Sequence, residues 1–197
     1  MYIFKYDKKI DTSCWKRVIK AGKLFGHSFL DSFYIDQSKI QIAKDRMKVY
    51  QQVWEPRHGA ILEGIKKIYK HPCPKKIRIY INTSPYSMDG YPKKHISITF
   101  KAKTHRRILT SISHELSHFV FKKYYTDFCR KIGCGKGEME EIKEILTVIN
   151  NIEIPGILDK GWPIHSNLRR WAKKQWRKNR NLKSLIRGMH ALLDKRS

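Results

Sequence analysis

The spacing of apolar residues changes along the chain and divides it into helical and extended parts. Between residues 40 and 70, apolar side chains recur every third or fourth position, which predicts a helix, and Pro56 divides this region into two helices. A shorter amphipathic helix is predicted over residues 15–25 and ends at Gly26, after the opening MYIFKY, which suits a short strand.

A different period follows at residue 77, where apolar and polar side chains begin to alternate. Ile77, Ile79 and Ile81 predict one strand, and the alternation in HISITF predicts a second. The run INTSPYSMDGYPKK between them is rich in turn-forming residues. We expect the strands to belong to a small antiparallel sheet.

The remainder of the chain reads as helical. Thr104 is a plausible N-cap for a helix that continues to Gly133, and a second helix is predicted over residues 139–151. Two basic helices are predicted after Pro155, over SNLRRWAKKQWRKN and LKSLIRGMHALLDK. The sequence therefore predicts an α+β fold that is mostly helical.

The length of 197 residues suits one hydrophobic core with an appendage rather than two full domains. We predict one domain over residues 1–155, which includes the N-terminal helices. Residues 156–197 would form a basic helical extension packed on or near it.

The charge of the chain adds a prediction about partners. The formal net charge is +25, with 42 basic and 17 acidic residues, and such a field attracts polyanions. The C-terminal segment is densest in cations and interleaves Trp171 and Trp176, as a surface that tracks phosphates and stacks on bases requires. The competing interpretation makes both tryptophans the buried side of a solvated helix. The basic residues concerned are Arg169, Arg170, Lys173, Lys174, Arg177, Lys178, Arg180, Lys183 and Arg187.

The cysteines and the hydropathy predict the compartment. The four cysteines are scattered, and the closest pair, in CRKIGC, lacks the CxxC spacing of a zinc knuckle or redox pair. No charged and apolar leader opens the chain, and no apolar run reaches the ~18 residues of a membrane span. We expect a reduced, cytoplasmic location.

The stretch ISHELSHF carries the clearest chemistry. His114 and His118 lie four residues apart and therefore one helical turn apart, which allows both imidazoles to bind one Zn²⁺. The apolar residues of this helix cluster on the opposite face, which disfavours a packed structural pair. Glu115 would lie beside the metal and act as the general base.

A catalytic zinc also needs a third protein ligand, and GEMEEIKEILTVIN supplies the candidates. The helical face favours Glu141, because it flanks the apolar stripe. The length of the connection favours Glu144, because a returning antiparallel helix must climb about as far as the first helix ran past His118. Glu138 is a weaker candidate, and Glu140 best suits a solvated face paired with lysines.

The order of a strand (HISITF), a helix with HELSH and a glutamate on a following helix resembles the gluzincin group of zinc metallopeptidases. The similarity covers roughly residues 76–151 and is greatest to small single-domain members, the minigluzincins. It implies a zincin-like fold in which HISITF is an edge strand that binds extended substrate, with His114, His118 and a glutamate as zinc ligands. A departure is that the residue after the glutamate is not the usual acidic or small one.

The resulting prediction is a zinc metallopeptidase that acts on a peptide or protein substrate. His165, Tyr124 and Tyr125 are candidate donors to the developing oxyanion, and we expect His165, in GWPIH, to lie over the metal cleft. Two alternatives remain: a basic nucleic-acid-binding protein whose zinc is structural or absent, and a zinc hydrolase acting on something other than a peptide.

Overall fold

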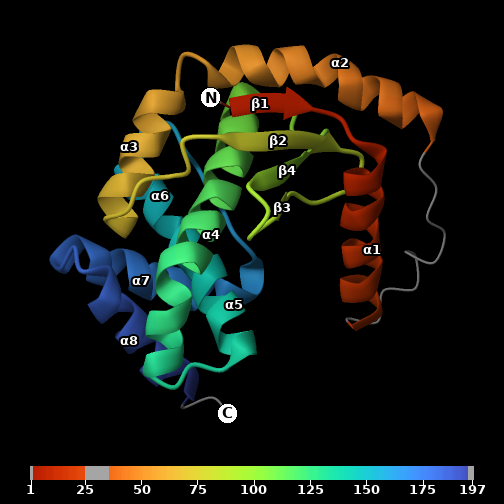
Figure 1. The fold of residues 1–197 in the computed structure, drawn as a ribbon. Coiled ribbons are helices and arrows are strands. Elements are labelled where there is room, and N and C mark those ends of the chain that lie inside the picture. Colours follow the sequence, from red (N-terminus) through yellow and green to blue (C-terminus); the bar gives the residue numbers. More distant parts are fainter. Residues whose placement is uncertain (1, 25–35, 195–197) are drawn as a thin grey trace. The chain divides into compact units, whose positions relative to one another are not determined.

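Alternating strand residues and long amphipathic runs produce a mostly helical chain with one small sheet (Figure 1). The structure is a computed structural model that describes residues 2–24 and 36–194. It divides into two compact units. The first comprises the chain up to Arg57 together with Pro74–Glu115, and the second comprises His58–Cys73 together with the chain from Leu116 onwards.

The first unit contains a mixed sheet of four strands in the order β1-β2-β4-β3. β1 pairs with β2 and β2 with β4 in parallel, and only β3 pairs antiparallel, with β4. Ile79, Ile81, Ile96 and Ile98 are almost fully buried in the two central strands. The strands are β1 (Tyr2–Lys5), β2 (Ile77–Asn82), β3 (Met88–Asp89) and β4 (His95–Thr99).

The expected antiparallel sheet with HISITF at its edge is therefore wrong in two respects. β2 and β4 run parallel, because the chain between them crosses back along the sheet, and the alternation of side chains does not record strand direction. β4 is also covered on its outer side, where β3 opposes Ile96 and Ser97. This return is tight: a Cβ on Gly90 would overlap the ring of His95, and the amide of Gly90 donates to the carbonyl of His95 at 3.0 Å.

Two helices accompany the sheet in the first unit. Tyr50 of α2 is buried and its hydroxyl donates to the carbonyl oxygens of Thr99 and Ala102, both at 2.9 Å, so α2 is fixed at the end of β4. Asp11 of α1 is buried and accepts from the amide and hydroxyl of Thr83. These helices are α1 (Lys8–Leu24) and α2 (Gln37–Trp54).

The second unit is helical. Its elements are α3 (His58–Tyr69), the later part of α4 (His105–Lys131), α5 (Lys136–Leu146), η2 (Thr147–Ile149), α6 (Asn150–Glu153), η3 (Pro163–His165), α7 (Ser166–Lys178) and α8 (Leu182–Asp194). α7 and α8 are amphipathic, and Leu168, Trp176, Leu185 and Met189 lie in the core. Residues 156–197 thus belong to the same compact unit as α5. The predicted division of the chain near residue 155, into a domain and a basic helical extension packed on or near it, stays a prediction.

Most helix boundaries follow the predicted signals. The break between α2 and α3 contains Pro56, and the hydroxyl of Thr104 accepts from the amide of Arg107 at 3.3 Å as the N-cap of α4. α4 ends at Lys131, and Gly133 follows with a φ of 92°. The predicted helix over residues 139–151 is interrupted by the 3-10 turn η2. The helix predicted over residues 15–25 is the later part of α1, and its expected end at Phe25 and Gly26 lies outside the described residues.

Candidate metal centre

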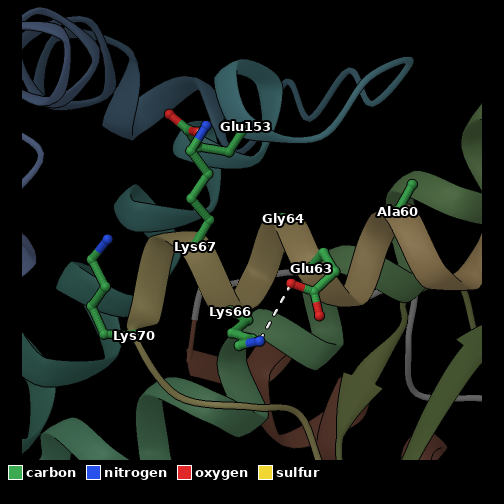
Figure 2. Close-up of a pocket in the computed structure, with 7 residues that line it drawn as sticks. All are labelled: Ala60, Glu63, Gly64, Lys66, Lys67, Lys70 and Glu153. Carbon is green, nitrogen blue, oxygen red and sulfur yellow. Dashed lines mark hydrogen bonds and ion pairs between the residues drawn. The ribbon is translucent and has the colours of Figure 1, made fainter.

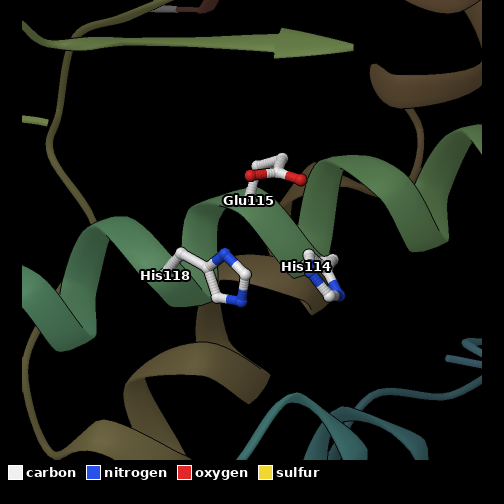
Figure 3. A group of neighbouring side chains, drawn as sticks. All are labelled: His114, Glu115 and His118. Carbon is white, nitrogen blue, oxygen red and sulfur yellow. The ribbon is translucent and has the colours of Figure 1, made fainter. Parts of the chain in front are cut away.

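The HELSH residues lie near the middle of α4. Figure 3 shows the two imidazoles leaving the helix on the same side, with the carboxylate of Glu115 leaving it on another. One potential ligand atom from each of His114, Glu115 and His118 can be chosen so that all three lie within 4.8 Å of one another. This arrangement follows from the helical repeat alone, because positions i and i+4 are neighbours on a helix.

Burial distinguishes this group from ordinary surface residues. Glu115 is 4% exposed and His118 is 2% exposed, whereas His114 is partly open to solvent. All residues from Ile112 to Phe121 except His114 are buried. The face of α4 opposite its main apolar stripe is therefore covered as well. Solvated surface histidines do not describe this group, because a buried carboxylate beside two imidazoles has lost most of its hydration.

Glu144 is the acidic side chain of α5 that reaches His118. Its Oε1 lies 3.6 Å from Nε2 of His118. Two ligands bound at about 2.0–2.2 Å to a tetrahedral Zn²⁺ lie about 3.4 Å apart, so this separation fits a shared ion. Glu144 thus lies level with His118, as the length of the connection between α4 and α5 predicts. Its role as a zinc ligand stays a prediction.

The other three glutamates of α5 have different partners. Glu141 Oε1 lies 3.3 Å from Nδ1 of His165, and Glu140 pairs with Lys143 at 2.7 Å and with Lys122 at 3.4 Å. Glu140 therefore forms the lysine-paired face that was expected of it.

Glu138 lies at the start of α5. It accepts from the amide of Gly135 at 3.3 Å and contacts His190. Glu144 is thus the member of the acidic run that is placed at His118.

The candidate oxyanion donors are placed less favourably. Tyr125 donates its hydroxyl to the carbonyl of Tyr69 at 2.7 Å, and Tyr124 stacks on His71 with ring centroids 4.1 Å apart. His165 lies against Glu141, one turn of α5 before Glu144. Its predicted role at the cleft stays a prediction, and Tyr125 is removed as a donor because its proton is already used.

Arg169 was missed as a site residue and counted only among the cations of the basic segment. It is 4% exposed, and its guanidinium donates to the carbonyl of Glu144 and to Oγ1 of Thr147, both at 2.8 Å. It also forms an ion pair with Asp159 at 3.0 Å. Arg169 therefore fixes the last turn of α5, which carries Glu144. Sequence could not separate it from its basic neighbours, because its role depends on distant residues.

Burial and its ion pair act on Arg169 in opposite directions. Burial lowers the pKa of the Arg169 guanidinium from its usual value, and the neighbouring Asp159 carboxylate opposes that shift. Because arginine titrates far above neutral pH, the side chain stays charged and the pair stays intact.

Lys143 is a second residue near Glu144 that the sequence did not predict to belong to the site. It is 5% exposed, and its Nζ lies 2.7 Å from Glu140 and 3.5 Å from Oε1 of Glu144. Lys143 therefore contacts the same carboxylate oxygen of Glu144 that faces His118.

A separate pocket lies on α3, and Figure 2 shows its lining side chains. Four of its five charged side chains form ion pairs, Lys67 with Glu153 at 2.9 Å and Lys66 with Glu63 at 3.5 Å. The pocket contains none of the predicted site residues; it is lined by Ala60, Glu63, Gly64, Lys66, Lys67, Lys70 and Glu153.

The basic C-terminal segment is only partly available to a ligand. Trp176 is 1% exposed and donates its indole N–H to Glu153 at 2.8 Å, so it is a core residue. Arg169 is buried too, Trp171 and Lys173 are partly exposed, and the remaining cations of the predicted set are exposed. The stacking role therefore fails for Trp176, because its ring is buried and cannot reach a base. A phosphate-binding role for the exposed cations is still a prediction.

Comparisons of the chain with protein-family models, curated proteins and solved structures gave no match. Among the described residues, no helix combines the length and the apolar character that crossing a membrane requires.

Proposed function

We propose that this protein is a zinc-dependent metallopeptidase. The observation that supports the proposal most is the carboxylate of Glu144 on α5, which lies 3.6 Å from His118 of the HExxH motif on α4, where Glu115 and His118 are buried. His114, His118 and Glu144 would hold the ion, which leaves one tetrahedral position for water or substrate.

The donor set fits zinc. Two imidazoles and one carboxylate are the ligands of many catalytic zinc sites, and they leave a net positive charge on the ion. When bound, Zn²⁺ supplies Lewis-acid polarisation of a carbonyl and makes a coordinated water easier to deprotonate.

The residues of the chain supply the remaining chemistry. Glu115 accepts the proton of the attacking water on a carboxylate oxygen and later delivers it to the leaving amine, and its burial strengthens both transfers by excluding bulk water. Lys143 and Arg169 are positioning residues, since Nζ of Lys143 lies 3.5 Å from the carboxylate of Glu144 and Arg169 donates to the carbonyl of Glu144.

Substrate binding differs from the scheme that the gluzincin resemblance implies. There, the strand before the zinc helix is an open edge that pairs with extended substrate. Here β3 occupies the middle of that edge, opposite Ile96 and Ser97. This pairing favours, as the alternative, a zinc hydrolase that acts on another amide or an ester.

Hydrolysis of an unfolded protein such as reduced casein tests the proposal. We expect cleavage by the zinc-loaded chain, loss of cleavage on chelation and its recovery on adding Zn²⁺. Parallel assays with small ester and amide substrates distinguish a peptidase from another hydrolase. Absence of all three activities from a folded, zinc-loaded chain would leave the basic binding protein as the better description.

A further inference from the structure

We propose a second metal site, structural in role, formed by Cys129, Cys134, Glu138 and His190. It lies entirely within the second unit, at the C-terminal end of α4, and would bind one thiophilic divalent ion such as Zn²⁺. The proposal does not depend on the peptidase function, since the two sites share no residue.

Three elements bring the ligand atoms together. The thiol of Cys134, one carboxylate oxygen of Glu138 and a ring nitrogen of His190 all lie within 4.8 Å of one another. Cys134 lies in the loop after α4, Glu138 in the first turn of α5 and His190 in α8. Ligands of one tetrahedral zinc lie about 3.3–3.8 Å apart, so an ion would bind by separating Glu138 Oε1 from Nδ1 of His190, which now lie 2.5 Å apart.

Cys129 supplies the fourth ligand. It is fully buried, in the last turn of α4 and five positions before Cys134. The turn after α4 brings the two residues together: the amide of Cys134 donates to the carbonyl of Cys129 at 3.0 Å, and Gly133 takes a φ of 92° that other residues rarely adopt. Four residues separate the cysteines, a spacing within the range of zinc sites.

The orientation of Glu138 also suits a ligand. Its Oε2 accepts from the amide of Gly135 at 3.3 Å, which caps α5, while its Oε1 lies 2.5 Å from Nδ1 of His190. One oxygen therefore orients the carboxylate and the other faces the cluster, as outer hydrogen bonds commonly do for metal ligands.

The ligand chemistry selects the ion. Thiolate and imidazole ligands favour zinc and related ions, whereas Mg²⁺ and Ca²⁺ require oxygen ligands. Four protein ligands fill a tetrahedral ion, which is typical of structural zinc and leaves no position for substrate. Such an ion would tie α8 to α4 and α5, and its binding free energy would add to the stability of the folded state.

Cobalt substitution tests this site separately from HELSH, because only this site contains thiols. We expect the reduced, full-length chain to bind Co²⁺ with the near-ultraviolet charge-transfer absorption of cobalt–thiolate bonds. Cys134→Ser should reduce that absorption, and the double variant Cys129→Ser and Cys134→Ser should abolish it. The double variant His114→Ala and His118→Ala should retain it.

Two further variants distinguish the loss of a metal ligand from the loss of the fold. Cys73→Ser, at another buried cysteine of the same unit, is the matched control and should retain the absorption. The side chain of His190 is 25% exposed, so His190→Gln should fold, as circular dichroism would verify, and bind cobalt at least about tenfold more weakly.

The proposal is overturned if the folded, reduced wild-type chain shows no cobalt–thiolate absorption. It is equally overturned if that absorption is undiminished in Cys134→Ser, or if it survives in the double variant Cys129→Ser and Cys134→Ser. None of these results bears on hydrolysis, so the failure of this site and the failure of the peptidase proposal are distinguishable.

Discussion

At the scale of single residues, the partner of each glutamate on α5 decides its role. Glu144 faces His118, whereas Glu141 faces His165. Glu144→Gln replaces an anionic ligand by a neutral amide, and we expect zinc affinity at the HELSH site to fall by at least about tenfold. Glu141→Gln is the matched control, and equilibrium titration against a zinc-sensitive dye should find its affinity unchanged. A loss confined to Glu141→Gln would identify that residue as the ligand instead.

The sequence could predict part of this arrangement and not the rest. The spacing of His114, Glu115 and His118 is fixed by one helix, so the sequence predicts their proximity directly. The choice between Glu141 and Glu144 depends on how α5 is rotated and raised relative to α4, which packing decides. Helical periodicity favoured Glu141 and connection length favoured Glu144; the structure places Glu144 at His118.

At the scale of elements, the end of α5 is bound by the buried Arg169, whose guanidinium lies against the backbone of Gly161. A Cβ on Gly161 would overlap the guanidinium of Arg169, and Gly161 has a φ of 60°. We expect Gly161→Ala to cost at least about 1 kcal/mol, which corresponds to a fall of about 2–4 °C in Tm. Zinc affinity at the HELSH site should weaken as well, because Arg169 binds the carbonyl of Glu144.

The control for this variant is Gly137→Ala, also in the second unit. Gly137 lies in α5 and an added Cβ there meets nothing within 4 Å. Alanine is the better helix former, so Tm should stay or rise. Thermal melts of the two variants with zinc removed and with zinc added separate the stability effect from the zinc effect. Equal Tm values for both variants would show that Arg169 is not held by this turn.

The sheet shows where element-level prediction stops. Alternation correctly located β2 and β4, since it reports which side chains are buried. It did not report that they run parallel or that β3 covers the outer side of β4. Both features depend on the path of residues 83–94, which joins β2 to β4 and contains β3. The alternation of side chains within a strand carries no information about that path.

At the scale of the whole molecule, the net charge of +25 predicts salt-sensitive binding to polyanions. The exposed cations of α7 test whether binding is local. Changing Lys174, Arg177 and Lys178 to Gln should weaken binding to a duplex oligonucleotide and reduce the slope of log affinity against log salt by about 2–3. Fluorescence anisotropy over a range of salt concentrations measures both.

The matched control removes three exposed lysines from the first unit, namely Lys8, Lys44 and Lys48, and so has the same net charge. Equal losses in the two variants would mean that charge in general, not α7, attracts the polyanion. Truncation before α7 would be a poor test, because Leu168, Trp176 and Leu185 belong to the core of the second unit.

The central claim is that α4 carries two of the three zinc ligands and the proton acceptor, and Glu115→Gln tests it most directly. The amide keeps the size of the side chain but cannot accept a proton. Zinc content should therefore equal that of the wild type, while hydrolysis should fall by about 10²–10⁴-fold. His114→Ala and His118→Ala should each contain one zinc fewer per chain. Full activity in a zinc-loaded Glu115→Gln variant, or unchanged zinc in both histidine variants, would contradict the account.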